Sequence, residues 1–167
     1  MAEHPAPRHL IGLISDTHGR LDARVAAALS GVERILHAGD VGRPEVLWEL
    51  QTVAPVDAVC GNVDRWDIPG DELAPLVRLT LHGTRITLVH SRADLGRQAA
   101  LDTDVIVFGH SHMPVIEEID GVLWVNPGSA SQPRRSVIGR SVGILEIAEG
   151  EPPQATIVPL SNYGEQT

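Results

Sequence analysis

Five short apolar segments of this sequence end in the same way, each running into an Asp, His or Asn beside a glycine or another small residue. Segments of this length, rich in Val, Ile and Leu and bounded by turn residues, are typical of buried strands. In open α/β sheets, ligands bind outside the carboxyl ends of the strands, so these polar residues are expected to share one edge. The side chains predicted to converge there are Asp16, His18, Asp40, Asn62, His90, His110 and His112.

The two halves of the chain differ in their predicted elements. In the first half, strand and helix patterns alternate, which favours a parallel sheet with crossover helices. The second half favours antiparallel hairpins. These strands are too many for one sheet flanked by so few helices, so we expect an α/β fold of two sheets packed face to face with helices outside. The predicted strands are 10–15, 34–38, 56–60, 76–81, 85–89, 105–108, 115–119, 122–125, 142–147 and 155–160, and the helices are 20–29, 44–53 (with Trp48 in the core) and 95–101.

Length and charge restrict the class of protein. A chain of 167 residues suits one domain and can bury a substantial core. With 13 Lys and Arg against 22 Asp and Glu, the net charge of −9 argues against a nucleic-acid partner. The sequence has no apolar run near the ~20 residues of a membrane helix and only one cysteine, so we expect a cytoplasmic protein with no membrane association. We expect a flexible tail over 1–8, a single domain over 9–162 and a frayed end over 163–167.

The residue types in the predicted cluster favour a metal centre. Each position alone has an ordinary explanation, since Asp and Asn commonly form turns after strands. Together, four imidazoles, two carboxylates and one amide suit Mn, Fe, Zn or Co, and the lack of cysteine excludes a thiolate-bound structural zinc site. Seven ligands exceed what one tetrahedral ion takes, so two ions sharing a carboxylate are predicted. Such a pair is the usual machinery for displacement at phosphorus.

The order of these motifs resembles the signature of the calcineurin-like metallophosphoesterases. In size the chain is similar to the small bacterial and archaeal phosphodiesterases of that superfamily, which are themselves similar to the metallophosphoesterase-like subunit of retromer. The resemblance implies a four-layer α/β/β/α sandwich of two packed mixed sheets with outer helices. The matching motifs are Asp16-Thr17-His18-Gly19, Gly39-Asp40, Gly61-Asn62-Val63-Asp64, His90, Gly109-His110-Ser111-His112 and Asn126-Pro127-Gly128-Ser129.

Carried over position by position, the resemblance implies two ion sites that share one carboxylate. The first ion would bind Asp16, His18, Asp40 and His112, and the second Asp40, Asn62, His90 and His110. Manganese is our first expectation for both ions, with Fe, Zn, Co or Ni as alternatives. The implied activity is hydrolysis of a small phosphodiester by a metal-bridging hydroxide, with Asp40, Asn62, His90 and His110 as the catalytic residues.

Two positions depart from the family pattern. Much of the family carries a histidine after the metal-binding Asn, thought to assist the leaving group, where this chain has Val63. Because general acid catalysis contributes about 10²–10⁴-fold, we expect hydrolysis to be restricted to good leaving groups. Ser91 stands where glycine commonly follows the ligand His90; its hydroxyl could reach a substrate phosphate, but a helix N-cap is the simpler role.

Two other polar residues are candidates for indirect roles, and an alternative to an enzyme remains open. Asp64 is expected to orient Asn62 or the backbone of its loop, with plain turn formation as the alternative, and Arg134 is either a phosphate contact or a surface residue. His9 and His82 are assigned no chemical role. The alternative is a catalytically weak or inactive protein-interaction scaffold with the same fold. A phosphomonoesterase activity and a homo-oligomer also remain open.

Overall fold

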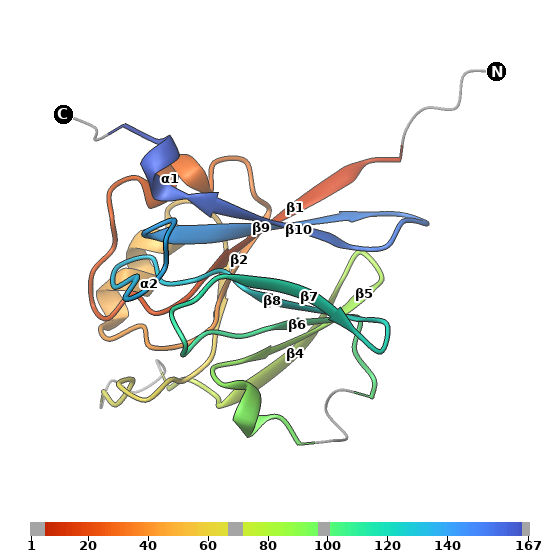
Figure 1. Ribbon diagram of the computed structural model, residues 1–167, viewed down its shortest axis with the longest axis horizontal. Coiled ribbons are helices and arrows are strands. Elements are labelled where there is room, and N and C mark those ends of the chain that lie inside the picture. The colour runs from red at the N-terminus through yellow and green to blue at the C-terminus, as the bar shows by residue number, and fades with distance from the viewer. Residues whose placement is uncertain (1–5, 67–71, 97–100, 165–167) are drawn as a thin grey trace.

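The computed structural model describes residues 6–66, 72–96 and 101–164, which form two five-stranded sheets (Figure 1). The first sheet contains β1 (Arg8–Ile14), β2 (Arg34–His37), β3 (Val56–Ala58), β9 (Ser141–Ala148) and β10 (Gln154–Pro159). Its order is β10-β9-β1-β2-β3, in which β1, β2 and β3 are parallel and β9 and β10 join in antiparallel register. The three parallel strands therefore end at the same edge.

The second sheet is also mixed. It contains β4 (Leu76–Leu81), β5 (Thr84–Val89), β6 (Val105–Val107), β7 (Val115–Ile119) and β8 (Val122–Asn126), in the order β4-β5-β6-β8-β7. The strands β5, β6 and β8 are parallel, and the antiparallel hairpins β4–β5 and β7–β8 form the two sides. The predicted class, an α/β sandwich of two mixed sheets, is confirmed.

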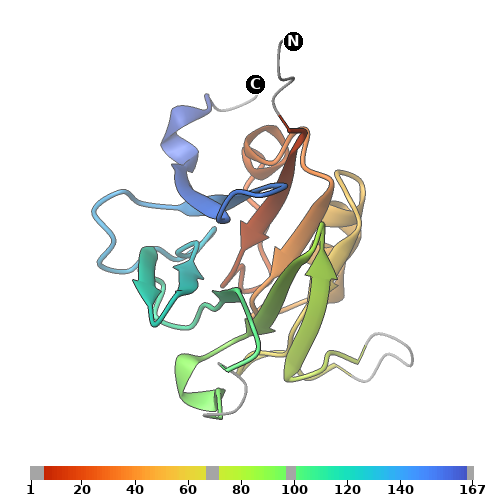
Figure 2. The ribbon, with the colours of Figure 1, turned by 90° about the vertical axis from the view of Figure 1, so that its right-hand side faces the viewer.

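Two α-helices, α1 (Val25–Ala28) and α2 (Pro44–Gln51), lie on the outer side of the first sheet (Figures 1 and 2). Among the described residues, the second sheet carries the 3₁₀ helix η1 (Arg92–Asp94) on its side, and η2 (Leu160–Asn162) follows β10. Most of the helix predicted over 95–101 falls on residues 97–100, which lie outside the described part.

The helix predicted over 20–29 is shortened to α1. The carboxylate of Asp22 accepts the backbone N–H of Arg24 at 3.0 Å and also binds the guanidinium groups of Arg24 and Arg140. Short polar side chains that bind nearby backbone groups in this way compete with the helical hydrogen bonds. The segment before α1 is therefore a turn.

Apolar side chains from both sheets fill the space between them. Ile11, Leu13 and Leu36 of the first sheet belong to one fully buried cluster with Ile86 and Leu88 of the second. A separate cluster packs α1 and α2 against the outer face of the first sheet. This arrangement holds the two sheets rigidly together, so that loops from both can contribute to one site.

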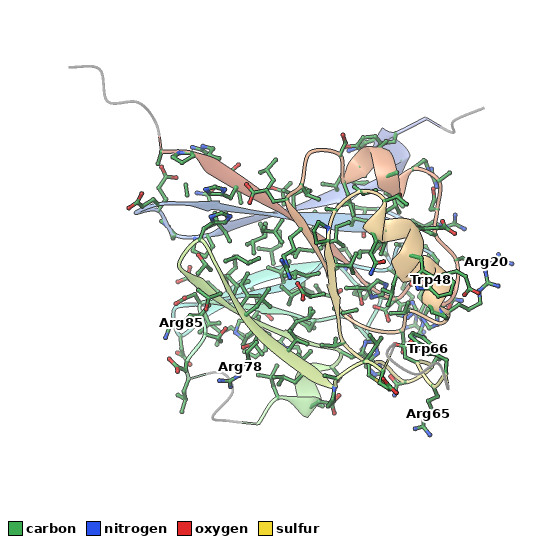
Figure 3. All side chains as sticks on the ribbon, turned by 180° about the vertical axis from the view of Figure 1, so that it is seen from behind. Arg20, Trp48, Arg65, Trp66, Arg78 and Arg85 are labelled. Atoms are coloured by element: carbon green, nitrogen blue, oxygen red, sulfur yellow. The ribbon has the colours of Figure 1, made fainter. Side chains whose placement is uncertain are left out.

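Trp48 was expected in the core but is 49% exposed. The buried residues of α2 include Val46 and Leu50, which lie four positions apart on one face. At 100° per residue, Trp48 lies 200° around the helix from Val46, and Figure 3 labels it on the outer flank of the molecule.

The chain ends lie partly outside the described residues. β1 begins at Arg8, one residue before the predicted start of the domain, and residues 1–5 and 165–167 are not described. Tyr163 packs against the cluster beneath α1 and α2. In the described part of the chain, every helix is too short or too polar to cross a bilayer.

Candidate metal centre

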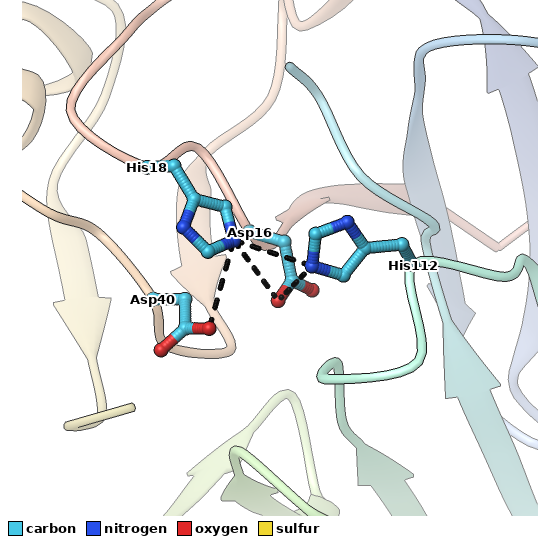
Figure 4. A group of neighbouring side chains, drawn as sticks. All are labelled: Asp16, His18, Asp40 and His112. Carbon is cyan, nitrogen blue, oxygen red and sulfur yellow. Dashed lines mark hydrogen bonds and ion pairs between the residues drawn. The ribbon is translucent and has the colours of Figure 1, made fainter. Parts of the chain in front are cut away.

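The carboxyl ends of β1 and β2 bring four of the predicted ligands together. Asp16 and His18 follow β1, Asp40 follows β2, and His112 lies between β6 and β7. One ligand atom from each residue lies within 4.8 Å of all the others (Figure 4). His18 Nε2 lies 3.6 Å from Asp40 Oδ2 and 3.2 Å from His112 Nε2. His112 Nε2 in turn lies 3.3 Å from Asp16 Oδ1.

Hydrogen bonds behind two of the imidazoles determine which ring nitrogen faces the centre. His90 Nδ1 donates to the carbonyl oxygen of Ala38 at 2.7 Å, and His112 Nδ1 donates to the carbonyl oxygen of Gln132. With the proton on Nδ1, a neutral imidazole has its lone pair on Nε2. A backbone carbonyl that fixes the tautomer in this way is the usual support of a metal-binding histidine.

Two buried acceptor atoms at the centre, Asp16 Oδ1 and His90 Nε2, have no hydrogen-bond partner. With its proton on Nδ1, His90 presents the lone pair of Nε2 toward Asp40 Oδ2, 3.4 Å away. An unsatisfied buried acceptor costs about 1–3 kcal/mol, and a divalent cation bound between these atoms would remove that cost. The donor set therefore fits divalent metal ions.

The two carboxylates have opposite pKa shifts. Burial raises the pKa of Asp16 above its ordinary value, although a hydrogen bond from Ser15 Oγ at 2.6 Å opposes the shift. Burial also acts to raise the pKa of Asp40, but His90, the Val63 N–H and His18 together hold it well below its usual range. Asp40 is therefore ionised even without a cation, which is the form in which a carboxylate binds a metal ion.

The remaining predicted ligands surround an adjoining cavity of about 270 Å³. Asn62, His90 and His110 line it together with Cys60 and Ser91. The ring of His110 lies edge-on to that of His90, with centroids 5.2 Å apart. This second group is looser than the first, because Asn62 and His110 are exposed, whereas His90 is buried beside Asp40.

Left-handed backbone conformations gather at the centre. Of the eight non-glycine residues with positive φ in the described part, five are predicted ligands, namely Asp16, His18, Asp40, His110 and His112. Residues in this region typically cost about 1–3 kcal/mol each and persist where the surroundings determine them strongly. Here backbone bonds link the two loops, since His18 N donates to Asp40 O and Asp16 N donates to Gly39 O.

Asp64 ties together the loops that follow β2 and β3. Its carboxylate accepts the N–H groups of Val41, Gly42 and Gly61 at 3.1, 2.7 and 2.8 Å. A Cβ on Gly61 would lie 2.2 Å from the backbone nitrogen of Asp40, so only glycine permits this approach. Asp64 therefore orients the loop backbone, which was one of the roles expected for it.

The loop after β8 supports the end of β1. The buried Ser129 Oγ donates to Asp16 O at 2.7 Å and accepts the N–H of Gln132 at 2.8 Å. Asn126 Nδ2 donates to Gly109 O at 2.9 Å, just before His110. The Asn126–Ser129 motif therefore positions backbone around the ligands.

The two other candidates play smaller parts. Ser91 Oγ accepts the N–H of Ala93 and caps η1, as expected for an N-cap, while the residue also lines the cavity beside His90. Arg134 is exposed, has a positive φ and lines neither cavity beside the ligands. The structure therefore gives it no contact with the centre.

A larger polar cavity of about 610 Å³ opens beside His18 and was not predicted. Its charged lining is balanced: Arg20, Arg43 and Arg140 against Asp22, Glu45 and Glu49. Arg140 forms an ion pair with Asp22 at 2.9 Å. A single sequence does not indicate that these residues line one cavity, because they come from three separate segments of the chain.

The fold and the donor set define a metal-dependent phosphoesterase of the calcineurin type, and comparison with known families agrees. The model of the calcineurin-like phosphoesterase superfamily domain matches residues 10–150, so the chain belongs to this family. It is 38% identical to a probable metallophosphoesterase of Methanothermobacter thermautotrophicus, over 89% of this chain and 91% of the relative. It is also 34% identical to the phosphodiesterase YfcE of Escherichia coli, over 72% and 78% of the two chains.

Solved structures share the fold. Vacuolar protein sorting 29 from Cryptosporidium parvum superposes with a TM-score of 0.71 and 21% identity, covering 90% of this chain and 97% of that one. Membership in this family and the names of its relatives support a phosphoesterase activity and imply divalent metal ions.

Proposed function

We propose that this protein is a binuclear metal-dependent phosphodiesterase that hydrolyses small phosphodiesters with good leaving groups. The observation that carries the proposal is the pair of unsatisfied, inward-facing acceptors, Asp16 Oδ1 and His90 Nε2, at the ends of two strands. Acceptors on either side of Asp40 support two ion sites that share this carboxylate. Membership in the phosphoesterase family supports the same reaction class.

The ligand residues divide into two groups in this proposal. Asp16, His18 and His112 hold one ion with Asp40, and Asn62, His90 and His110 hold the other with it. Two divalent ions would supply a nucleophilic water at neutral pH and positive charge for the phosphoryl oxygens. Manganese is the first choice among ions compatible with these ligands.

The protein's own groups fix the orientation of these ligands. Carbonyl oxygens of Ala38 and Gln132 hold the rings of His90 and His112, and Asp64 holds the loop that carries Asn62. Positive and negative side chains are equal in number around the 610 Å³ cavity beside His18. This polar lining supports a substrate in which the ester group that remains on the product is polar.

The test is hydrolysis of bis(p-nitrophenyl) phosphate and of p-nitrophenyl phosphate by metal-stripped protein titrated with Mn²⁺, Zn²⁺ and Mg²⁺. We expect metal-dependent cleavage of the diester and slower cleavage of the monoester. His110→Ala should lower the diester rate at least about 100-fold, since an exposed ligand is lost with little effect on folding. His82→Asn, at an exposed histidine far from this centre, is the matched control and should keep the full rate.

A second candidate function is a protein-interaction scaffold, which the apolar, exposed Val63 next to the candidate ligand Asn62 favours. The same titration separates the two functions. If the protein binds metal but turns over neither ester with any ion, or if His110→Ala keeps the wild-type rate, the enzyme proposal is wrong.

A further inference from the structure

A second group of metal-binding side chains lies at the opposite end of the strands from the catalytic candidates. His9 is near the start of β1, Glu33 directly precedes β2, and His82 is in the turn of the β4–β5 hairpin. One ligand atom from each lies within 4.8 Å of the other two. In Figure 2 the β4–β5 hairpin points toward the starting ends of β1 and β2. The group therefore joins the two sheets.

The three side chains already converge through hydrogen bonds. Glu33 Oε1 lies 2.6 Å from His9 Nδ1, and Glu33 Oε2 lies 2.8 Å from His82 Nε2. The imidazole rings of His9 and His82 stack with centroids 3.3 Å apart and an interplanar angle of 11°. Two histidines thus present one nitrogen each to a single carboxylate.

The backbone under these ligands is fixed. Glu33 N donates to Leu10 O at 2.8 Å, which locks the Glu33 position onto β1 beside His9. His82 has a φ of 48° and is followed by Gly83 with a φ of 81°, the pattern of a tight two-residue hairpin turn. The ligands therefore need only side-chain rotation to surround an ion.

We propose that His9, Glu33 and His82 form a Zn²⁺ site that is separate from the catalytic centre. Two imidazoles and one carboxylate, with water in the fourth position, satisfy tetrahedral zinc. The metal would bind between Glu33 and the two rings through His9 Nδ1 and His82 Nε2, with the single proton of each neutral imidazole on its other nitrogen. A nitrogen-rich set of this kind favours Zn²⁺ over Mn²⁺ or Mg²⁺.

The location predicts what the ion does. His9 lies seven residues before Asp16, so about 23 Å of extended strand separates the two sites. A bound ion would join β1 and β2 of the first sheet to the β4–β5 hairpin of the second. It would therefore act on stability and leave the catalytic groups unchanged.

The experiment compares wild type, His82→Asn and Asp120→Asn. Asn is well tolerated at positive φ, so His82→Asn removes a ligand and keeps the turn. Asp120→Asn is the matched control, because Asp120 has a φ of 52° in the other tight hairpin turn, before Gly121. Each metal-stripped protein is titrated with Zn²⁺ while the bound equivalents, the melting temperature and the particle mass are measured.

Wild type and Asp120→Asn should bind one more equivalent of Zn²⁺ than His82→Asn. Loss of an outer partner of a metal ligand costs about 10–100-fold in affinity, so loss of a ligand should exceed 100-fold. At free Zn²⁺ ten times its dissociation constant, this site should raise the melting temperature by about 3–6 °C in wild type. Hydrolysis of bis(p-nitrophenyl) phosphate with Mn²⁺ should be equal in all three, which separates this proposal from the catalytic one.

Equal Zn²⁺ stoichiometry in wild type and His82→Asn would overturn the site. A rise in particle mass on Zn²⁺ addition that disappears in His82→Asn would also overturn it, because the ligands would then come from two chains. Glu33→Gln gives an independent check, since it keeps the side-chain shape and should lose the same equivalent.

Discussion

Val63, the residue after the candidate ligand Asn62, has 47% of its surface exposed, and its backbone N–H donates to Asp40 Oδ1 at 3.2 Å. The main chain at this position thus supports the shared carboxylate, while the side chain has no proton to give. Under the proposed function, Val63 would restrict the leaving group without disturbing the ligands.

Replacing Val63 with histidine should widen the range of leaving groups. We expect Val63→His to raise kcat/KM for a diester with an alkyl leaving group by about 10²-fold or more, because a general acid contributes about 10²–10⁴-fold. The p-nitrophenyl diester should change little, since its leaving group needs no proton. Steady-state rates on a series of leaving groups measure this. Val63→Gln, polar but not titratable, is the control, and an equal gain in both variants would contradict the general-acid explanation.

Among the secondary-structure elements, the candidate metal centre depends on the loops after β2 and β3 keeping their relative positions. The three backbone N–H groups that donate hydrogen bonds to the Asp64 carboxylate belong to the loops after β2 and β3. Asp64→Asn replaces one acceptor oxygen with a donor that faces an N–H. We expect a loss of about 1–3 kcal/mol in the free energy of unfolding and a 10–100-fold weaker metal affinity. Denaturant unfolding and metal titration measure the two effects.

The exposed Glu118 on β7 offers the matched control for Asp64. Glu118→Gln makes the same chemical change on the surface and should leave both quantities within error. If Asp64→Asn lowers stability but leaves metal affinity unchanged, the carboxylate supports the fold alone and its positioning role is wrong.

Strands were predictable from the sequence to within a few residues, because β-branched runs bounded by glycine and Asp have few alternatives. The helix over 20–29 was not, since Asp22 also binds Arg140, a residue 118 positions away that the local pattern does not reveal. Trp48 was expected inside because of its place on the predicted helix, whereas the packed face of α2 is centred on Val46 and Leu50.

The positions of the ligands at strand ends were enough to predict that they converge. The groups that hold their side chains in place could not be predicted. The carbonyl oxygens that hold His90 and His112 are backbone atoms of Ala38 and Gln132, and backbone atoms carry no residue signature. His9 and His82 are 73 positions apart, and only the packing of the two sheets brings them to Glu33.

For the whole molecule, one buried histidine links folding to pH. His37, at the end of β2, is completely buried. Its Nδ1 accepts the N–H of Gly39, and its Nε2 lies 3.0 Å from Thr17 Oγ1, whose own proton goes to Val41 O. These bonds suit the neutral ring with its proton on Nε2, and burial lowers the pKa of His37 to about 3.

A lowered histidine pKa makes the native state less stable in acid. The unfolded chain takes up a proton below its ordinary pKa of 6.5, whereas native His37 stays neutral down to about pH 3. The contribution of neutral His37 to the free energy of unfolding is therefore fully present above pH 6.5 and is lost as the pH falls toward 3. Between pH 7 and pH 5 the free energy of unfolding should fall by about 2 kcal/mol from this residue alone.

Urea unfolding of the metal-free protein at pH 7, 6 and 5 measures this loss, with His37→Gln as the reference. Because the variant cannot titrate at this position, the difference between the two profiles isolates His37 from other groups. His90 works in the opposite direction, since Asp40 raises its pKa against the effect of burial, and the subtraction removes that contribution. Parallel profiles would mean that native His37 takes up a proton as readily as the unfolded chain does. The buried network between β1 and β2 would then not be what sets the acid limit of the fold.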